Sequence, residues 1–96
     1  MAKFTRKSAS GTYFHGITIQ TTVSKLIEKF PNSYDEGGDK TNYDFTLETE
    51  DGDVFTVYDW KHYGGIGMDE VVDFHIGSHN QAVSVKAKAE LEKLFA

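Results

Sequence analysis

Hydrophobic residues recur at helical spacing in two segments of the chain. Either of the two threonines before Val23 can cap the first helix, and Pro31 ends it. Asn80 is in place to cap the second helix. We therefore expect helices over about 22–30 and about 81–95. Their core-facing stripes would be formed by Val23, Leu26, Ile27 and Phe30 and by Val83, Ala87, Leu91, Leu94 and Phe95.

In the middle of the chain, hydrophobic and polar residues alternate one by one. Tyr43, Phe45 and Leu47 are each separated by one polar residue, which is the period of a strand with one buried face. The turn that follows contains Asp51-Gly52, and the next segment is rich in β-branched and aromatic residues. This pattern predicts an antiparallel hairpin with strands at 43–49 and 54–60.

Further extended segments flank these elements. Residues 12–20 read as two short segments that meet at His15-Gly16, as a hairpin or as a kinked strand, and 71–76 reads as another strand. Glycines and acidic residues indicate loops at 32–41 and 61–70. We expect a single α+β domain over 1–96, with an antiparallel sheet of about four strands packed against the two helices. Residues 1–11 read as a flexible lead-in.

The composition agrees with a small folded domain. Of the 96 residues, 39% are hydrophobic and 14% are aromatic, which suffices for a thin core between one sheet and two helices. The chain has no cysteine, so neither disulfides nor thiolate metal sites are available. We expect no secretory signal, and no apolar stretch of this sequence is long enough to span a membrane. We expect a cytoplasmic protein, and homo-oligomerisation stays open.

Negative charge is concentrated in one part of the chain. Residues 35–73 hold twelve of the fifteen acidic side chains but only two of the ten Lys and Arg residues, and the net charge is −5. Direct binding of nucleic acid is therefore not expected, because it needs clustered cations. A partner with a basic surface is expected instead. The candidate partner-binding residues are Asp44, Glu48, Glu50, Asp51, Asp53, Asp59, Asp69, Glu70 and Asp73.

The spacing of these carboxylates suggests a mechanism for such binding. Asp44 and Glu48 share the strand face opposite Phe45 and Leu47, and alternate residues of a strand lie about 6.6–6.8 Å apart. Neighbouring phosphates of a nucleic-acid strand have a spacing of similar scale. The surface could thus mimic DNA and occupy the basic channel of a nucleic-acid-acting protein.

A second group combines aromatic and cationic side chains at the end of the hairpin. Such a group can stack on a nucleobase while its cations contact a phosphate. The alternative function is therefore a sponge that sequesters a signalling nucleotide. The candidate ligand-binding residues are Lys40, Tyr58, Trp60, Lys61, His62 and His75.

The sequence gives no reason to expect an enzyme. It lacks a nucleophile elbow, a phosphate-binding loop and a dinucleotide fingerprint, and its four histidines do not form the H-E-x-x-H motif of zinc proteases. We expect no catalytic residue, no metal and no cofactor. Asp59 falls on the inner face of its strand if Phe55 and Val57 are buried, so its carboxylate needs a partner such as Lys40, Lys61 or His75.

Several short stretches resemble a family of small phage-encoded proteins. The stretches are Asp51-Gly52, Thr56-Val57-Tyr58-Asp59-Trp60-Lys61 and Phe74-His75-Ile76-Gly77, within a resemblance that covers roughly 22–85. Phe74 and Ser78 stand where the family usually has Trp and Gly. The resemblance implies a phage or prophage origin and an accessory role, with no catalytic residues to transfer.

These observations lead to one expected function and two alternatives. The expected function is a non-enzymatic phage counter-defence inhibitor that blocks a host nucleic-acid-acting protein through its acidic, phosphate-mimicking surface. The alternatives are the nucleotide sponge and a small structural or assembly factor.

Overall fold

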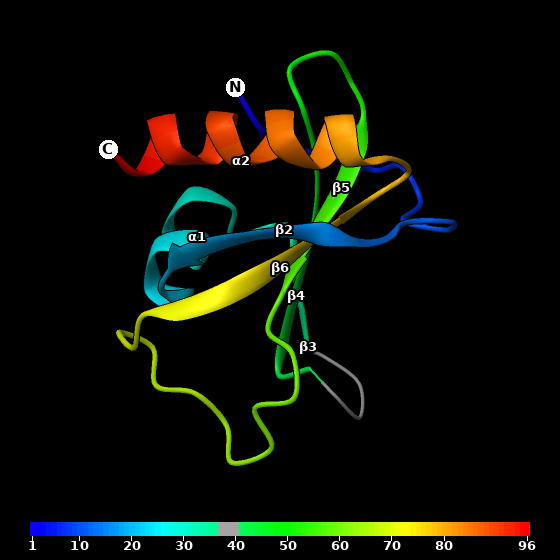
Figure 1. Ribbon diagram of the computed structural model, residues 1–96. Helices are drawn as coiled ribbons and strands as arrows, with labels where there is room; N and C mark the ends of the chain where they lie inside the picture. The colour runs from blue at the N-terminus through cyan, green and yellow to red at the C-terminus, as the bar shows by residue number, and fades with distance from the viewer. Residues whose placement is uncertain (37–40) are drawn as a thin grey trace.

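The structure is a computed structural model that describes residues 1–36 and 41–96. It has one antiparallel sheet and two helices, which confirms the predicted α+β class (Figure 1). The strands follow the order β1-β4-β5-β6-β2, and β3 also pairs with β4. In chain order the elements are β1 (Lys3–Phe4), β2 (Tyr13–Thr21), α1 (Val23–Lys29), β3 (Tyr34–Glu36), β4 (Tyr43–Glu48), β5 (Val54–Tyr58), β6 (Val72–Ser78) and α2 (Gln81–Phe95).

The strand register gives the sheet two different faces. Phe45 pairs with Val57, and Val57 pairs with Ile76, so the three side chains point to the same side of the sheet. All three are fully buried, together with Leu26 of α1 and Leu91 of α2. Both helices therefore cover this inner face, and the core lies between them and the sheet.

The two helices begin where the sequence predicts. The Thr22 side chain accepts a hydrogen bond from the backbone N–H of Lys25, and the Asn80 side chain accepts one from Val83. Each cap satisfies an N–H group that the first turn of a helix leaves without a partner. Among the described helices, neither is long and apolar enough to cross a membrane.

The side of the sheet next to β4 differs from expectation. Residues 1–11 were expected to form a flexible lead-in, but β1 pairs with β4 and Ala2 is buried in the core. Part of the predicted loop at 32–41 is strand β3, while its residues 37–40 lie outside the described part of the chain. Two- and three-residue edge strands have no alternation long enough to be recognised in a sequence.

Strand β2, which lies at the edge of the sheet beside β6, is long and continuous. β2 runs without interruption from Tyr13 to Thr21, and its pairing with β6 shifts between Phe14 and Thr18. Gly16 has a φ of +85° within this shift, a conformation that residues with a Cβ rarely adopt. Of the two forms that the sequence allowed, the kinked strand is the one observed.

Candidate functional site

Aromatic side chains gather on the face of the sheet that the helices leave uncovered. Tyr58 of β5 pairs with His75 of β6, and both point away from the core because their neighbours Val57 and Ile76 point into it. Phe14 of β2 and Trp60, which follows β5, complete the group. We call Phe14, Tyr58, Trp60 and His75 the ring cluster.

His75 lies at the centre of the ring cluster. Its ring stacks on Phe14, with centroids 3.9 Å apart and an interplanar angle of 13°. The Trp60 ring is nearly parallel to that of His75, with centroids 5.9 Å apart and an interplanar angle of 22°, and Tyr58 meets His75 edge-on at 5.6 Å. Three strands therefore contribute to one continuous aromatic surface, on which Phe14 and Trp60 are each 39% exposed.

Gly77 leaves room for the Phe14 ring to pack against His75. Phe14 is the cross-strand partner of Gly77, which has no side chain to occupy the space beside His75. A Cβ built on Gly77 would lie 2.7 Å from Oγ1 of Thr56 and 3.5 Å from the backbone of Tyr13. The close packing of β5, β6 and β2 at this point therefore depends on glycine.

Positive charge lies at one end of the ring cluster. The Lys61 ammonium is 5.8 Å from the centroid of the Trp60 ring, within the range of a cation–π interaction. The backbone of Lys61 has a φ of 61°, in the left-handed region that costs a residue with a Cβ roughly 1–2 kcal/mol. Strained residues of this kind are concentrated at binding sites.

The surroundings shift the pKa values of two members of the cluster. Burial lowers the pKa of His75, and His62 lowers it further, whereas Asp73 acts in the opposite direction. Burial raises the pKa of Tyr58, and the negative charge of Asp44 adds to this effect. Both shifts favour the neutral form of the ring, so at neutral pH the cluster presents uncharged aromatic surfaces.

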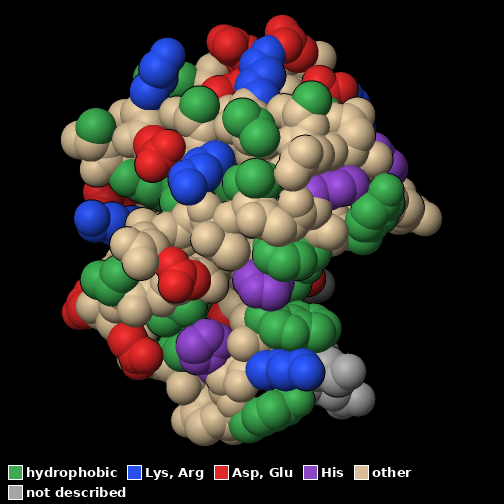
Figure 2. Space-filling model, viewed as in Figure 1, with side chains coloured by type: hydrophobic (Ala, Val, Ile, Leu, Met, Phe, Trp, Pro, Cys, Tyr) green, Lys and Arg blue, Asp and Glu red, His purple; other side chains and the backbone are tan. Residues whose placement is uncertain are grey.

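The space-filling view shows how such side chains lie at the surface. Figure 2 shows hydrophobic and histidine side chains, with a Lys or Arg side chain among them, around a hollow on one side of the molecule. Carboxylates are concentrated elsewhere in this view, above all at the top. The carboxylates at the top of this view thus lie apart from the hollow.

Comparisons with known proteins identify no relative of this chain. Searches against protein-family models, curated proteins and solved structures found no match for the chain. The functional argument therefore depends on the geometry of the site.

The acidic residues around the β4–β5 turn are largely matched by nearby cations. Glu48 lies 3.0 Å from the ammonium of Lys7, and its side chain is only 15% exposed. The Glu50 carboxylate is 3.4 Å from the amino group of Met1, and Asp51 forms an ion pair with Lys86 of α2. Asp53 lies exposed at the end of the same turn. These pairs hold β1, the turn and α2 together and reduce the negative field that the sequence predicted.

Asp59 does not belong to an exposed surface. Its carboxylate is fully buried and accepts hydrogen bonds from the backbone N–H groups of Asn42 and Tyr43, at 2.7 and 2.8 Å, and from the Asn42 side chain at 2.8 Å. The predicted burial is confirmed, but the described partners are amides and not Lys61 or His75, because His75 points to the opposite face of the sheet. Asp59 is therefore a structural clamp on the segment that enters β4, and its fully buried carboxylate is not part of the surface that a partner would contact.

The remaining acidic candidates lie apart from the β4–β5 turn. Asp69 accepts a hydrogen bond from Ser24 Oγ at 2.9 Å, and Glu70 accepts one from the backbone N–H of Gly67 at 3.2 Å. Both belong to the loop between β5 and β6, which lies at the opposite end of the molecule from the β4–β5 turn (Figure 1). Asp44 and Asp73 are on the uncovered face of the sheet. The nine acidic candidates therefore do not form one continuous surface.

The aromatic and cationic candidates lie closer to one another than the acidic candidates do. Tyr58, Trp60, Lys61 and His75 are in contact or nearly so, and His62 is close enough to influence the pKa of His75. Lys40 lies outside the described residues. Phe14 was missed, because the pairing of β2 with β6 that brings it to His75 leaves no local signal in the sequence.

The four histidines are not grouped as metal ligands in the described part of the chain. Within residues 1–36 and 41–96, no group of three His, Cys, Asp or Glu side chains has an arrangement that could hold a metal ion. His15 instead hydrogen-bonds through Nε2 to the Ser78 carbonyl at 2.8 Å.

Proposed function

We propose that this protein is a non-enzymatic binding module that holds a nucleotide against the uncovered face of its sheet. The observation that supports this proposal most is the ring cluster itself. Four rings from three strands contact one another beside the ammonium of Lys61, outside the helix-covered core. Stacking of a base on an aromatic side chain contributes roughly 1–3 kcal/mol, and it tolerates any base.

The charges around the cluster suggest which part of a nucleotide would lie where. The base would stack against Trp60, the largest of the exposed rings, and the phosphate would contact Lys61 and His62. Asp73, which is exposed on β6, would repel a second or third phosphate but can accept a hydrogen bond from a ribose hydroxyl or an amino group. A nucleoside monophosphate or a cyclic nucleotide is therefore the favoured ligand class.

A fluorescence titration tests this function. Addition of adenosine monophosphate, or of a cyclic nucleotide, should quench the emission of Trp60, the single tryptophan of the chain, in a saturable manner. Phe14→Ala should weaken the binding. Tyr13→Ala is the matched control, because Tyr13 is adjacent and 62% exposed but pairs with Ser78, whose side chain points into the core. A flat titration across purine and pyrimidine nucleotides would remove the proposal.

The acidic protein inhibitor is the second candidate. It is supported by the exposure of Glu50 and Asp51, whose side chains are 58% and 62% exposed at the β4–β5 turn. Replacement of Glu50, Asp51 and Asp53 by their amides should slow association with a basic host protein and reduce the salt dependence of the rate. Unchanged association would exclude this mechanism. A counter-defence role in a phage would accommodate either candidate, and it depends on the family resemblance alone.

A further inference from the structure

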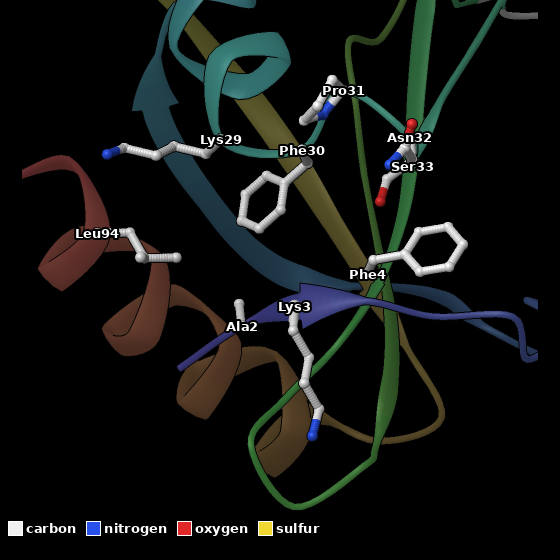
Figure 3. Close-up of a pocket in the computed structure, with 9 residues that line it drawn as sticks. All are labelled: Ala2, Lys3, Phe4, Lys29, Phe30, Pro31, Asn32, Ser33 and Leu94. Carbon is white, nitrogen blue, oxygen red and sulfur yellow. The ribbon is translucent and has the colours of Figure 1, made fainter.

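A second concave site lies on the other side of the molecule, away from the ring cluster. It is a pocket of about 290 Å³ between β1, the C-terminal end of α1 and the C-terminal end of α2 (Figure 3). Ala2, Phe30, Pro31 and Leu94 form apolar walls. Figure 3 shows the Phe30 ring and the Leu94 side chain directed toward the space between the two helices and β1. The size and the walls fit a small ligand with an apolar part.

One polar group in the lining of this pocket has no partner. Ser33 is 9% exposed, and among the described residues nothing hydrogen-bonds to its buried Oγ. The residue is fixed by its backbone, which donates to the Phe30 carbonyl at 3.1 Å and accepts from Thr46 at 3.3 Å. Figure 3 shows the hydroxyl directed toward the space between Phe30 and Phe4. Because buried hydroxyls are nearly always hydrogen-bonded, a ligand oxygen at this position would complete the site.

Two cations lie at the rim. Lys3 and Lys29 both line the pocket, and within the described part of the chain neither forms an ion pair. Figure 3 shows both side chains directed away from the space between Phe30 and Leu94, so their flexible stems must fold back to bring the ammonium groups over a bound anion. The rim therefore supplies positive charge that no described carboxylate neutralises.

We propose that this pocket binds a small amphipathic monocarboxylate. The hydrocarbon part would pack between Phe30 and Leu94, a carboxylate oxygen would accept a hydrogen bond from Ser33 Oγ, and Lys3 and Lys29 would balance the charge. The pocket is too small for a long acyl chain, so a medium-chain acid is the expected class. This site does not use the ring cluster, so it is independent of the nucleotide proposal.

Octanoate is a suitable probe, with amide chemical shifts of the intact protein as the readout. Octanoate should produce saturable shifts at Ala2, Phe30, Ser33 and Leu94. Octan-1-ol, which has the chain without the charge, and acetate, which has the charge without the chain, should each bind at least about fivefold more weakly. Absence of saturable shifts, shifts confined to the ring cluster, or equal binding of octanoate and octan-1-ol would overturn the proposal.

Two variants test separately how the charges of Lys3 and Lys29 and the hydroxyl of Ser33 contribute to binding. Lys3→Gln/Lys29→Gln should weaken octanoate binding by about fivefold, since each exposed lysine contributes a modest electrostatic interaction. Ser33→Ala should weaken it by a similar factor, because it removes the buried donor. Lys93→Gln is the matched control, as Lys93 is an exposed lysine of α2 outside the lining. An equal loss in Lys93→Gln, or no loss in both the double variant and Ser33→Ala, would contradict the assignment.

Discussion

The rings of Phe14 and His75 stack face to face, with centroids 3.9 Å apart and planes that differ by 13°. Phe14 lies near the start of the edge strand β2, and His75 lies in the middle of β6. The contact covers one face of the imidazole with hydrocarbon. It thereby gives the uncovered side of the sheet an aromatic centre, and burial lowers the pKa of His75.

The free energy of unfolding should therefore fall as the pH is lowered through the titration range of His75. The pKa of His75 is lowered in the folded protein by burial and by His62, so the unfolded chain binds the proton more tightly. The contribution of His75 is fully present above its ordinary pKa of about 6.5 and is lost as the pH falls toward the lower folded value. Urea unfolding at about pH 7.5 and about pH 5.5 should show this loss.

The control for this prediction is Phe14→Ala. Without the Phe14 ring, water reaches His75 in the folded state, and the part of the pH dependence that His75 contributes should shrink. His75→Gln should lack that part altogether. A pH dependence that is identical in the wild type and in both variants would show that burial under Phe14 does not govern the protonation of His75.

Asp59→Ala should be strongly destabilising. The substitution leaves the part-buried N–H groups of Asn42 and Tyr43 without the acceptor that they have in the wild type. The expected loss in the free energy of unfolding is about 2–4 kcal/mol, measured by urea denaturation. Asp53→Ala removes an exposed carboxylate from the other end of β5 and should change stability by less than about 0.5 kcal/mol. Similar effects of the two substitutions would contradict the clamp role of Asp59.

Gly77→Ala should destabilise the protein by about 1–3 kcal/mol, because the new methyl group overlaps Oγ1 of Thr56. Thr56→Ala removes that oxygen, so the double variant Gly77→Ala/Thr56→Ala should lose less than the sum of the two single losses. Gly64→Ala, where an added Cβ meets nothing within 4 Å, is the control. Additive losses in the double variant would mean that the Tyr13 backbone, and not Thr56, limits the space.

Lys61→Gly should weaken nucleotide binding without lowering the stability of the fold. Glycine adopts the φ of 61° without steric cost, so the free energy of unfolding should stay the same or rise by up to about 1 kcal/mol. The same change removes the ammonium beside Trp60 and should weaken nucleotide binding. Thermal unfolding and the Trp60 titration on one preparation measure both effects. A clear loss of stability would show that Lys61 is held by interactions that outweigh its backbone strain.

Elements with a strong hydrophobic period could be predicted from the sequence. Helix α2 follows its apolar stripe and its Asn80 cap, and the β4–β5 hairpin follows the alternation that begins at Tyr43. Strands β1 and β3 could not be predicted, because each is too short to show an alternation of hydrophobic and polar residues. Both pair with β4. The burial of Ala2 follows from that pairing as well.

The candidate site was predictable only in part. The adjacent residues Tyr58, Trp60 and Lys61 were recognisable as an aromatic and cationic group, and His75 was included as part of the neighbouring strand. Phe14 was not, because its position depends on the register between β2 and β6 and on the shift near Gly16. The ion pairs of the acidic residues with Lys7 and Lys86 could not be predicted either, since they connect segments far apart in the sequence.

The central claim is that the uncovered face of the sheet binds a nucleotide through the ring cluster. Mapping of adenosine monophosphate binding by two-dimensional NMR of the isotopically labelled protein tests it most directly. We predict saturable shifts at Phe14, Tyr58, Trp60, Lys61 and His75, with the amides of α2 unaffected. Absence of shifts at these five residues, or shifts confined to the β4–β5 turn, would contradict the claim.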